Sequence, residues 1–190
     1  MKVLVGFAAL LLAVSAQAEG LNMYAGGGIG QSTAKDVCSD VAGFPGVSCD
    51  DKATSIKGFF GYQLNRNVAF EAAVNGFGEV KAQGPGGTVK ANSAAVEGDV
   101  ILSLPLGSQF SLYGKVGIYS AYTKVEANTT TVVGTFDDNN VDITYGFGGR
   151  WDFAERWAGR VEWQLYKSVG GSDTGETDID TINVAVMYKF

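Results

Sequence analysis

The sequence contains no histidine, only two cysteines and three prolines, and no apolar run long enough for a transmembrane helix. Without histidine, the chain lacks the usual general base of serine and cysteine hydrolases. The longest apolar stretch, residues 3–14, is well short of the roughly 20 residues that a spanning helix needs. We therefore expect no cofactor, no metal centre and no enzymatic activity.

Carboxylates are the remaining candidates for acid–base chemistry. Glu97 and Asp99 lie two residues apart on one strand face, and further acidic residues fall at 50–51, 137–138 and 173–180. Packing of the first pair inside the fold and solvation of the others explain these positions better than catalysis does. The loop carboxylates also raise the hypothesis that they bind divalent cations, or bridge to lipopolysaccharide through them. Their spacing, however, does not match an EF-hand.

The N-terminal residues have the pattern of a secretory signal peptide. Lys2 precedes the apolar run, and Ala16-Gln17-Ala18 forms a small-residue cleavage site. An N-terminal core helix is the competing interpretation. The pattern predicts a signal peptide over residues 1–18 and a single domain over residues 19–190. The formal net charge of −6, with scattered Lys and Arg, argues against nucleic acid as a partner.

Eight segments alternate apolar and polar residues with a period of two, which predicts strands. They cover residues 21–31, 55–64, 67–75, 92–104, 110–122, 142–153, 157–166 and 181–190. The last segment is the clearest, because Ile182, Val184, Val186 and Tyr188 share one face and Asn183 and Lys189 the other. We expect it to pair with the first segment, because an open sheet edge cannot persist in hydrocarbon.

The connections alternate between short and long. Residues 65–66, 105–109 and 154–156 form short turns, whereas residues 32–54, 76–91, 123–141 and 167–179 are long and polar. This pattern is typical of an outer-membrane barrel with long loops outside the cell. The sequence therefore predicts an all-β fold, an eight-stranded antiparallel up-and-down transmembrane β-barrel. A soluble β-sandwich is the alternative, but it has less reason to sort its loops by length.

Aromatic residues gather near the ends of the predicted strands on the short-turn side. They are Phe110, Phe153, Trp157, Tyr188 and Phe190. Such a girdle suits the boundary between hydrocarbon and headgroups, so the apolar faces are expected to meet lipid and the polar faces the interior. The predicted partners are accordingly outer-membrane lipid and lipopolysaccharide.

The predicted interior carries five positive and five negative side chains. They are Lys57, Glu71, Glu97, Asp99, Lys115, Arg150, Asp152, Arg160, Glu162 and Lys189. Because an eight-stranded barrel is just wide enough for side chains to fill it, these charges are expected to pair into a network that plugs the lumen. Asp152 and Lys189 are expected to be solvated at the barrel end.

Two smaller features complete the pattern. Cys38 and Cys49 are expected to form a disulfide that closes a loop in an exported chain. Metal binding is the competing interpretation, but the sequence offers no histidine or further cysteine as a ligand. The run Gly26-Gly27-Gly28-Ile29-Gly30 does not have the spacing of a phosphate-binding loop, and it opens no helix. A glycine-rich barrel strand is the better interpretation.

Three stretches carry a family resemblance. Residues 57–71 read KGFFGYQLNRNVAFE, residues 145–153 read YGFGGRWDF before RVEWQ at 160–164, and the chain ends on VMYKF at 186–190. These resemble the transmembrane barrels of the OmpA-like family. The resemblance implies assembly by the barrel-assembly machinery through the terminal aromatic strand, here Tyr188 and Phe190. It also implies charged lumen residues, here Glu71, Lys115, Arg150, Arg160 and Glu162.

The resemblance does not carry over the cell-wall role of the best-known members, because their peptidoglycan-binding domain would follow Phe190. The leading expectation is a structural or interaction barrel of the bacterial outer membrane whose long loops contact an extracellular ligand. A narrow pore, or a barrel that passes small apolar compounds as in the OmpW-like family, is the alternative.

Overall fold

The computed structural model of the chain describes residues 22–35, 38, 48–85, 87–129, 133–171 and 175–190. Within these ranges the elements are β1 (Met23–Ala34), β2 (Ser48–Asp50), β3 (Lys52–Gln63), β4 (Val68–Gly84), β5 (Gly87–Pro105), β6 (Phe110–Thr129), β7 (Val133–Asp152), β8 (Trp157–Gly171) and β9 (Gly175–Lys189). The predicted signal peptide, residues 1–18, lies outside the described residues. In the described part of the chain, no helix has the length and apolarity to cross a bilayer.

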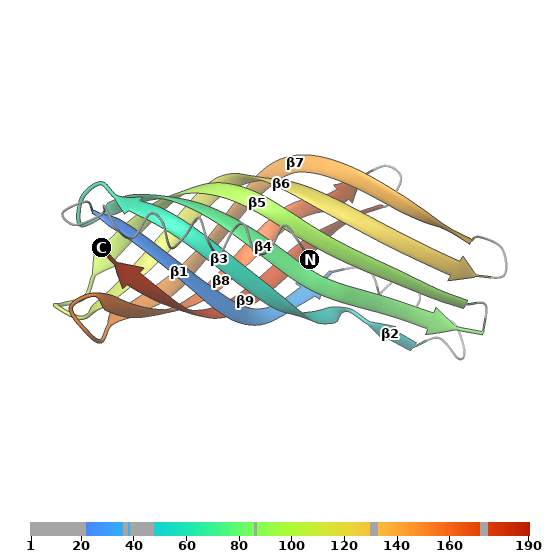
Figure 1. Ribbon diagram of the computed structural model, residues 1–190, viewed down its shortest axis with the longest axis horizontal. Coiled ribbons are helices and arrows are strands. Elements are labelled where there is room, and N and C mark those ends of the chain that lie inside the picture. Colours follow the sequence, from blue (N-terminus) through green and yellow to red (C-terminus); the bar gives the residue numbers. More distant parts are fainter. Residues whose placement is uncertain (1–21, 36–37, 39–47, 86, 130–132, 172–174) are drawn as a thin grey trace.

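Eight long antiparallel strands close into a barrel, as the sequence predicted (Figure 1). Strands β3 to β9 follow one another around the wall, and β9 returns to β1. That closing seam runs from Tyr24 opposite Lys189 to Ala34 opposite Ile179. The short β2, which the sequence did not predict, pairs beside β4. Closure satisfies the backbone groups that hydrocarbon would otherwise leave without partners.

The glycine run of β1 allows this seam to close tightly. A Cβ atom added at Gly28 would lie 2.5 Å from the Val184 carbonyl oxygen, and one at Gly30 would collide with the Ile182 carbonyl. Gly27, which points outward, would meet only an ordinary contact with the Lys57 carbonyl at 3.5 Å. The run therefore serves close strand approach and opens no helix.

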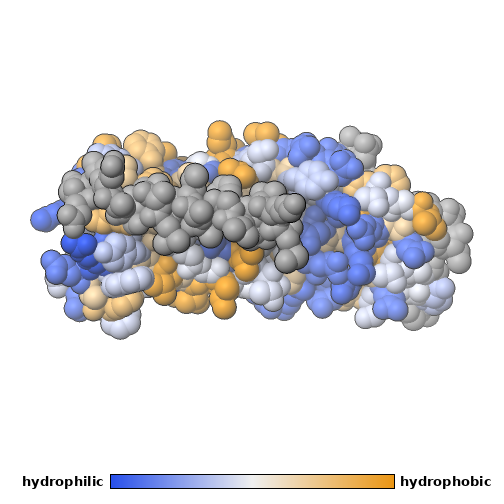
Figure 2. Space-filling view, viewed as in Figure 1, coloured by the Kyte–Doolittle hydropathy of each residue, from blue (hydrophilic) through white to orange (hydrophobic). Residues whose placement is uncertain are grey.

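The outward face of the barrel is apolar where it borders the short turns. Ile29, Ile56, Val96, Ile118 and Val184 are each 59% to 67% exposed. In Figure 2, hydrophobic side chains gather over the half that ends in the short turns, on the left, and hydrophilic ones lie near the middle of the molecule. A folded protein in water has no reason to expose so many large apolar side chains on one band. The band is the surface that meets lipid, and below we call it the apolar band.

Aromatic rings circle the short-turn end of the apolar band. Phe110 stacks on Trp151 at 6.1 Å between ring centroids, and Trp157 meets Tyr188 at 5.0 Å. Phe153, Phe110 and Trp157 are all about half exposed. The structure therefore places the predicted girdle where the lipid headgroups would lie.

Three of the four predicted long loops are wrong as loops, because nearly all of their described residues continue the strands. Strands β5, β6 and β7 have 19, 20 and 20 residues, whereas about 9–11 residues suffice to span a membrane. Paired backbone extends to Gly84 opposite Gly87 and to Asn128 opposite Val133. The β4–β5 and β6–β7 hairpins therefore stand well beyond the apolar band (Figure 1). Segments rich in Thr and Val satisfy their backbone groups better in a ladder than in an open loop.

The two faces of these hairpins exchange polarity beyond the apolar band. In β4, Glu71 points inward and Phe70 outward, but a register shift between Gly76 and Glu79 turns Glu79 outward. Gly78 sits in this bulge with a φ of 77°, a conformation that glycine adopts without strain. Val80 consequently lines the interior. On β4, apolar outside with charge inside thus becomes charge outside with apolar inside, which is the pattern expected where a strand leaves lipid and enters water.

Candidate functional site

The centre of the lumen holds a cluster of ionic side chains at the level of the apolar band. Among the described residues, seven Lys, Arg, Asp and Glu side chains that point inward are almost fully buried: Lys57, Glu71, Glu97, Asp99, Lys115, Arg160 and Glu162. They come from β3, β4, β5, β6 and β8, so the cluster joins walls on all sides of the barrel. We call these seven residues the lumen cluster.

Two lysines bridge the carboxylates of the lumen cluster. Lys57 Nζ lies 2.7 Å from Glu162 Oε1 and 3.0 Å from Glu97 Oε1. Lys115 Nζ lies 2.8 Å from Asp99, 3.2 Å from Glu97, 3.6 Å from Glu71 and 3.7 Å from Glu162. Each ammonium therefore has several anionic neighbours, which offsets the cost of removing it from water.

Arg160 binds two of the same carboxylates. Its Nη1 donates to Glu71 Oε2 at 2.6 Å, and its Nη2 donates to Glu162 Oε2 at 2.7 Å. The guanidinium carbon also lies 4.6 Å from the Phe59 ring centroid and 4.8 Å from that of Tyr113. A planar fork packed between two rings is held in one orientation, which a flexible lysine could not reproduce.

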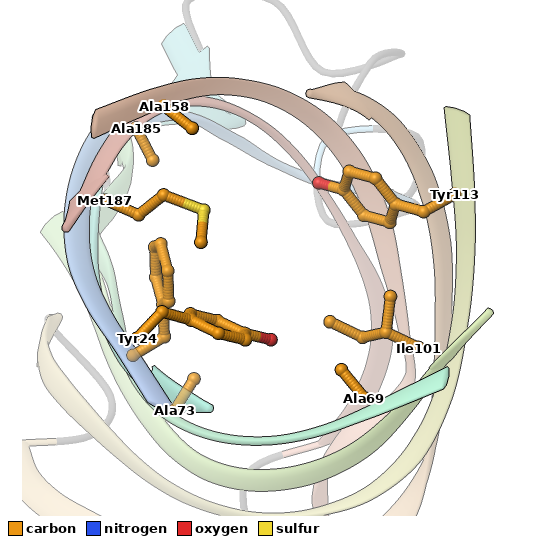
Figure 3. Close-up of a cluster of buried hydrophobic side chains, with 9 residues drawn as sticks. Tyr24, Ala69, Ala73, Ile101, Tyr113, Ala158, Ala185 and Met187 are labelled. Carbon is orange, nitrogen blue, oxygen red and sulfur yellow. The ribbon is translucent and has the colours of Figure 1, made fainter. Parts of the chain in front are cut away.

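Uncharged side chains hydrogen-bond to the lumen cluster, and the sequence analysis did not single them out. Tyr24 donates to Glu71 at 3.0 Å, and Tyr113 donates to Glu162 at 2.8 Å. Gln164 donates to Glu97 at 2.8 Å and accepts from Lys57 at 2.7 Å. In Figure 3, Tyr24 and Tyr113 point into the barrel from opposite walls. Their inward parity along β1, β6 and β8 is the signal that could have revealed them.

The lumen cluster is not charge-neutral. Within the described chain it holds three cations and four carboxylates, which leaves one negative charge in excess. Asp99 is the least satisfied member, because within the described chain Lys115 is its only ionic partner and its carboxylate oxygens accept no hydrogen bond. The stability of this carboxylate in the lumen thus depends on Lys115.

Arg150 lies outside the lumen cluster, which corrects its predicted place there. Its Nε donates to Asp152 at 3.0 Å, and Lys189 reaches the same carboxylate at 2.7 Å. These three residues are part-exposed and line a cavity of about 810 Å³ that opens at the short-turn end. Arg150 is two residues from the end of β7, so its charged group pairs at this mouth, although the side chain also lines the small void beside Arg160.

The interior is divided by the lumen cluster. On the short-turn side lies the cavity of about 810 Å³, followed by a void of about 20 Å³ against Tyr24, Tyr113 and Arg160. On the opposite side lies a separate cavity of about 280 Å³ that begins at Ser93 and Thr123. No residue of the lumen cluster lines that outer cavity.

The outer face of the protruding hairpins carries paired charges. Glu79 lies 2.9 Å from Lys81 and 3.5 Å from Lys90, and Lys124 lies 2.7 Å from Glu126. The hydrogen bond from Lys81 lowers the pKa of the Glu79 carboxyl, and that from Lys124 lowers the pKa of Glu126. Both signs of charge alternate on this surface, with no cationic patch among these residues.

The remaining predicted positions are also placed. Cys38 and Cys49 form a disulfide, as predicted, and it ties the chain after β1 to β2. Tyr188 packs against Phe190 at 5.3 Å, and the Phe190 backbone N–H donates to Met23 across the closing seam at 3.0 Å. Among the described residues, no three acidic or cysteine side chains converge as a metal site.

Comparison with known proteins relates this chain to a family of outer-membrane barrels. The sequence profile of the family described as outer membrane protein beta-barrel domain matches residues 4–190. Outer membrane protein A of Yersinia pseudotuberculosis serotype I (strain IP32953) is 25% identical over 191 residues, which cover 98% of this chain and 53% of that protein. The chain thus spans about half the length of this curated relative.

Two solved structures share the fold. Neisserial surface protein A superposes with a TM-score of 0.63 at 12% identity, over 89% of this chain and 97% of that one. Ail, the attachment invasion locus protein of Yersinia pestis, superposes with a TM-score of 0.55 at 13% identity, over 90% and 99%. At such low identity these likenesses establish the fold alone.

Proposed function

Because the chain belongs to the outer membrane protein beta-barrel domain family, we propose that it is a closed, non-conducting barrel of the bacterial outer membrane that presents its tall hairpins to a partner outside the cell. The lumen cluster carries the first half of this proposal. Seven buried charges with mutual distances of 2.6–3.7 Å fill the barrel at mid-height. Opening a path for ions would separate these pairs, at a cost of several kcal/mol for each unpaired buried charge.

The length and polarity of the β4–β5 and β6–β7 hairpins support the second half. A paired, four-stranded extension is a far more ordered surface than a set of loops, so it loses less conformational entropy when a partner binds. Its outer face alternates Lys and Glu, which suits a protein surface of mixed charge. The barrel then acts as an anchor, and the hairpins form the contact surface.

A polyanion is a less suitable partner. A structure of Ail holds the heparin analogue sucrose octasulfate, and recognition of such a ligand requires unpaired cations. Here Lys81, Lys90 and Lys124 each lie within 3.5 Å of a glutamate. We therefore propose a protein partner for this chain.

A pore is the second candidate, and bilayer conductance distinguishes it. The full chain, refolded and inserted in planar bilayers, should show no steady conductance. Replacing Arg160 with Ala should produce openings, whereas Arg150→Ala, which leaves the ion pairs of the lumen cluster intact, should not. Steady conductance of the unaltered protein that Arg150→Ala enlarges would support the pore and refute the plug.

The contact surface is tested on cells. Bacteria that display the full chain are compared with bacteria in which residues 124–138 are replaced by a two-residue turn, at equal surface amounts. The intact protein should increase cell retention on an epithelial layer or cell-to-cell clumping, and the shortened one should not. Equal behaviour of both in both assays would refute the contact role of the β6–β7 hairpin.

A further inference from the structure

The cavity of about 280 Å³ in the protruding half has an apolar lining. Eight of its residues are apolar: Ala34, Phe77, Val80, Val89, Ala91, Val125, Val169 and Ile179. They come from six strands, β1, β4, β5, β6, β8 and β9, and face one another across the interior. Below we call this space the outer cup.

The hydroxyl groups that line the outer cup have partners within the protein. Ser32 donates to the Phe77 carbonyl, Thr177 donates to the Lys35 carbonyl, and the Ser93 and Thr123 hydroxyls lie 2.9 Å apart. These hydroxyls already have protein partners, so apolar groups dominate the surface that a bound molecule would contact. An apolar void of about 150 Å³ in another protein stays dry and binds small apolar molecules, and the outer cup is nearly twice that volume.

The floor of the outer cup is aromatic. Phe77 and Tyr166 meet at 4.7 Å between ring centroids, and Tyr119 meets Tyr166 at 5.3 Å. Both tyrosines are essentially fully buried. This layer separates the outer cup from the lumen cluster, so a molecule that enters from outside would stay in the cup and not pass through the barrel.

The charges that line the outer cup limit the kind of molecule that could bind there. Glu176 is the single ionisable residue of the described lining, and the lining contains no Lys or Arg. A carboxylate or sulfate would find no counter-charge there, whereas an uncharged group would enter without electrostatic cost and an ammonium could face Glu176. The volume is that of about nine waters at roughly 30 Å³ each, which suits a molecule of about ten non-hydrogen atoms.

We propose that the outer cup is a binding site for a compact apolar molecule of about ten non-hydrogen atoms that carries no negative charge. The bulge at Gly78 builds the site, because it turns Val80 inward and Glu79 outward on the same strand. The site lies outside the apolar band, so it is filled from the water phase. It is independent of the partner contacts made by the outer face of the hairpins.

Methyl NMR of the full chain in lipid nanodiscs tests this site with a matched probe series. The probes are 1-naphthylmethanol, 1-naphthylmethylammonium and 1-naphthoate, which share one ring system and differ in charge. The first two should shift the methyl signals of Val89, Val125 and Val169 saturably, while the lipid-facing Val96 and Val116 change only in proportion to probe dissolved in the bilayer. The carboxylate should bind at least tenfold more weakly than the alcohol.

Two variants on neighbouring positions of β5 serve as a matched pair. Ala91→Phe places a ring in the outer cup and should abolish the saturable shifts, whereas Asn92→Phe places the same ring on the outer face and should leave them intact. Equal, unsaturable shifts of all five valines, binding of 1-naphthoate as tight as the alcohol, or unchanged binding in Ala91→Phe would each overturn the proposal. The wild-type comparison stands even if Ala91→Phe fails to fold.

Discussion

Replacing Lys115 with methionine removes the cation on which the lumen cluster depends most. Its ammonium lies within 3.7 Å of four carboxylates and is the only ionic partner of Asp99 among the described residues. Methionine keeps much of the length and packing of the side chain, so the change is mainly one of charge. The negative excess within the described cluster rises from one to two. Removal of one partner from a buried pair costs about 3–5 kcal/mol, and we expect a loss of that size.

Asp99→Asn is the diagnostic second change. Alone it removes the excess negative charge, so it should cost little or even stabilise the barrel. Combined with Lys115→Met, it should recover a substantial part of the loss, because the carboxylate left without a partner is gone. The double-mutant cycle should therefore show a coupling free energy of about 1–3 kcal/mol.

The assay is reversible urea unfolding of the full chain in lipid vesicles, followed by tryptophan fluorescence and by the gel mobility of the unheated sample. Lys124→Met is the matched control, because this lysine lies on the outer face and pairs with Glu126 in water. It should change stability by less than about 0.5 kcal/mol. If Lys115→Met costs no more than this control, or if the Lys115 and Asp99 changes are simply additive, the reasoning about buried pairing is wrong.

Three further predictions concern the seam, the terminal strand and the disulfide. Gly30→Val should destabilise the barrel by roughly 1–3 kcal/mol through overpacking against β9, while Gly27→Val, on the open face, should be tolerated; equal urea midpoints would contradict the seam geometry. Deletion of Phe190 should lower the assembled, heat-modifiable yield in cells far more than deletion of one turn residue, and an unchanged yield would rule it out as an assembly signal. Cys49→Ser should leave the barrel folded but raise protease cleavage between residues 35 and 52, and unchanged cleavage would show that the disulfide does not hold this segment.

The sequence predicted the barrel well because a lipid-facing strand has a strict rule. Each outward residue must be apolar, so Ile182, Val184 and Val186 mark both the strand and its face, and the same parity places Glu97 and Lys115 inside. The closing pair of β9 with β1 followed from the need to satisfy every edge in hydrocarbon. None of these inferences required knowledge of distant contacts.

The sequence-based predictions were wrong beyond the apolar band and at the strand ends, where outward residues no longer have to be apolar. Residues 123–141 read as a polar loop because they include exposed charged residues such as Lys124 and Glu126, although residues 123–128 are paired with residues 133–138 in one ladder. Arg150 has the inward parity of Arg160, but its position near the end of β7 gives it Asp152 as partner. Tyr24 and Gln164 hydrogen-bond to the lumen cluster only through the register that brings their strands to its level.

The sequence by itself determined the strand count, the face that meets lipid and the charges that must enter the lumen, since each depends on residues two apart along one strand. The tertiary structure decided which of those charges meet, how far the hairpins rise and where the outer cup forms. Those features depend on the shear of the barrel and on one extra residue at the β4 bulge, which reverses the faces of a strand without any local change in its alternation.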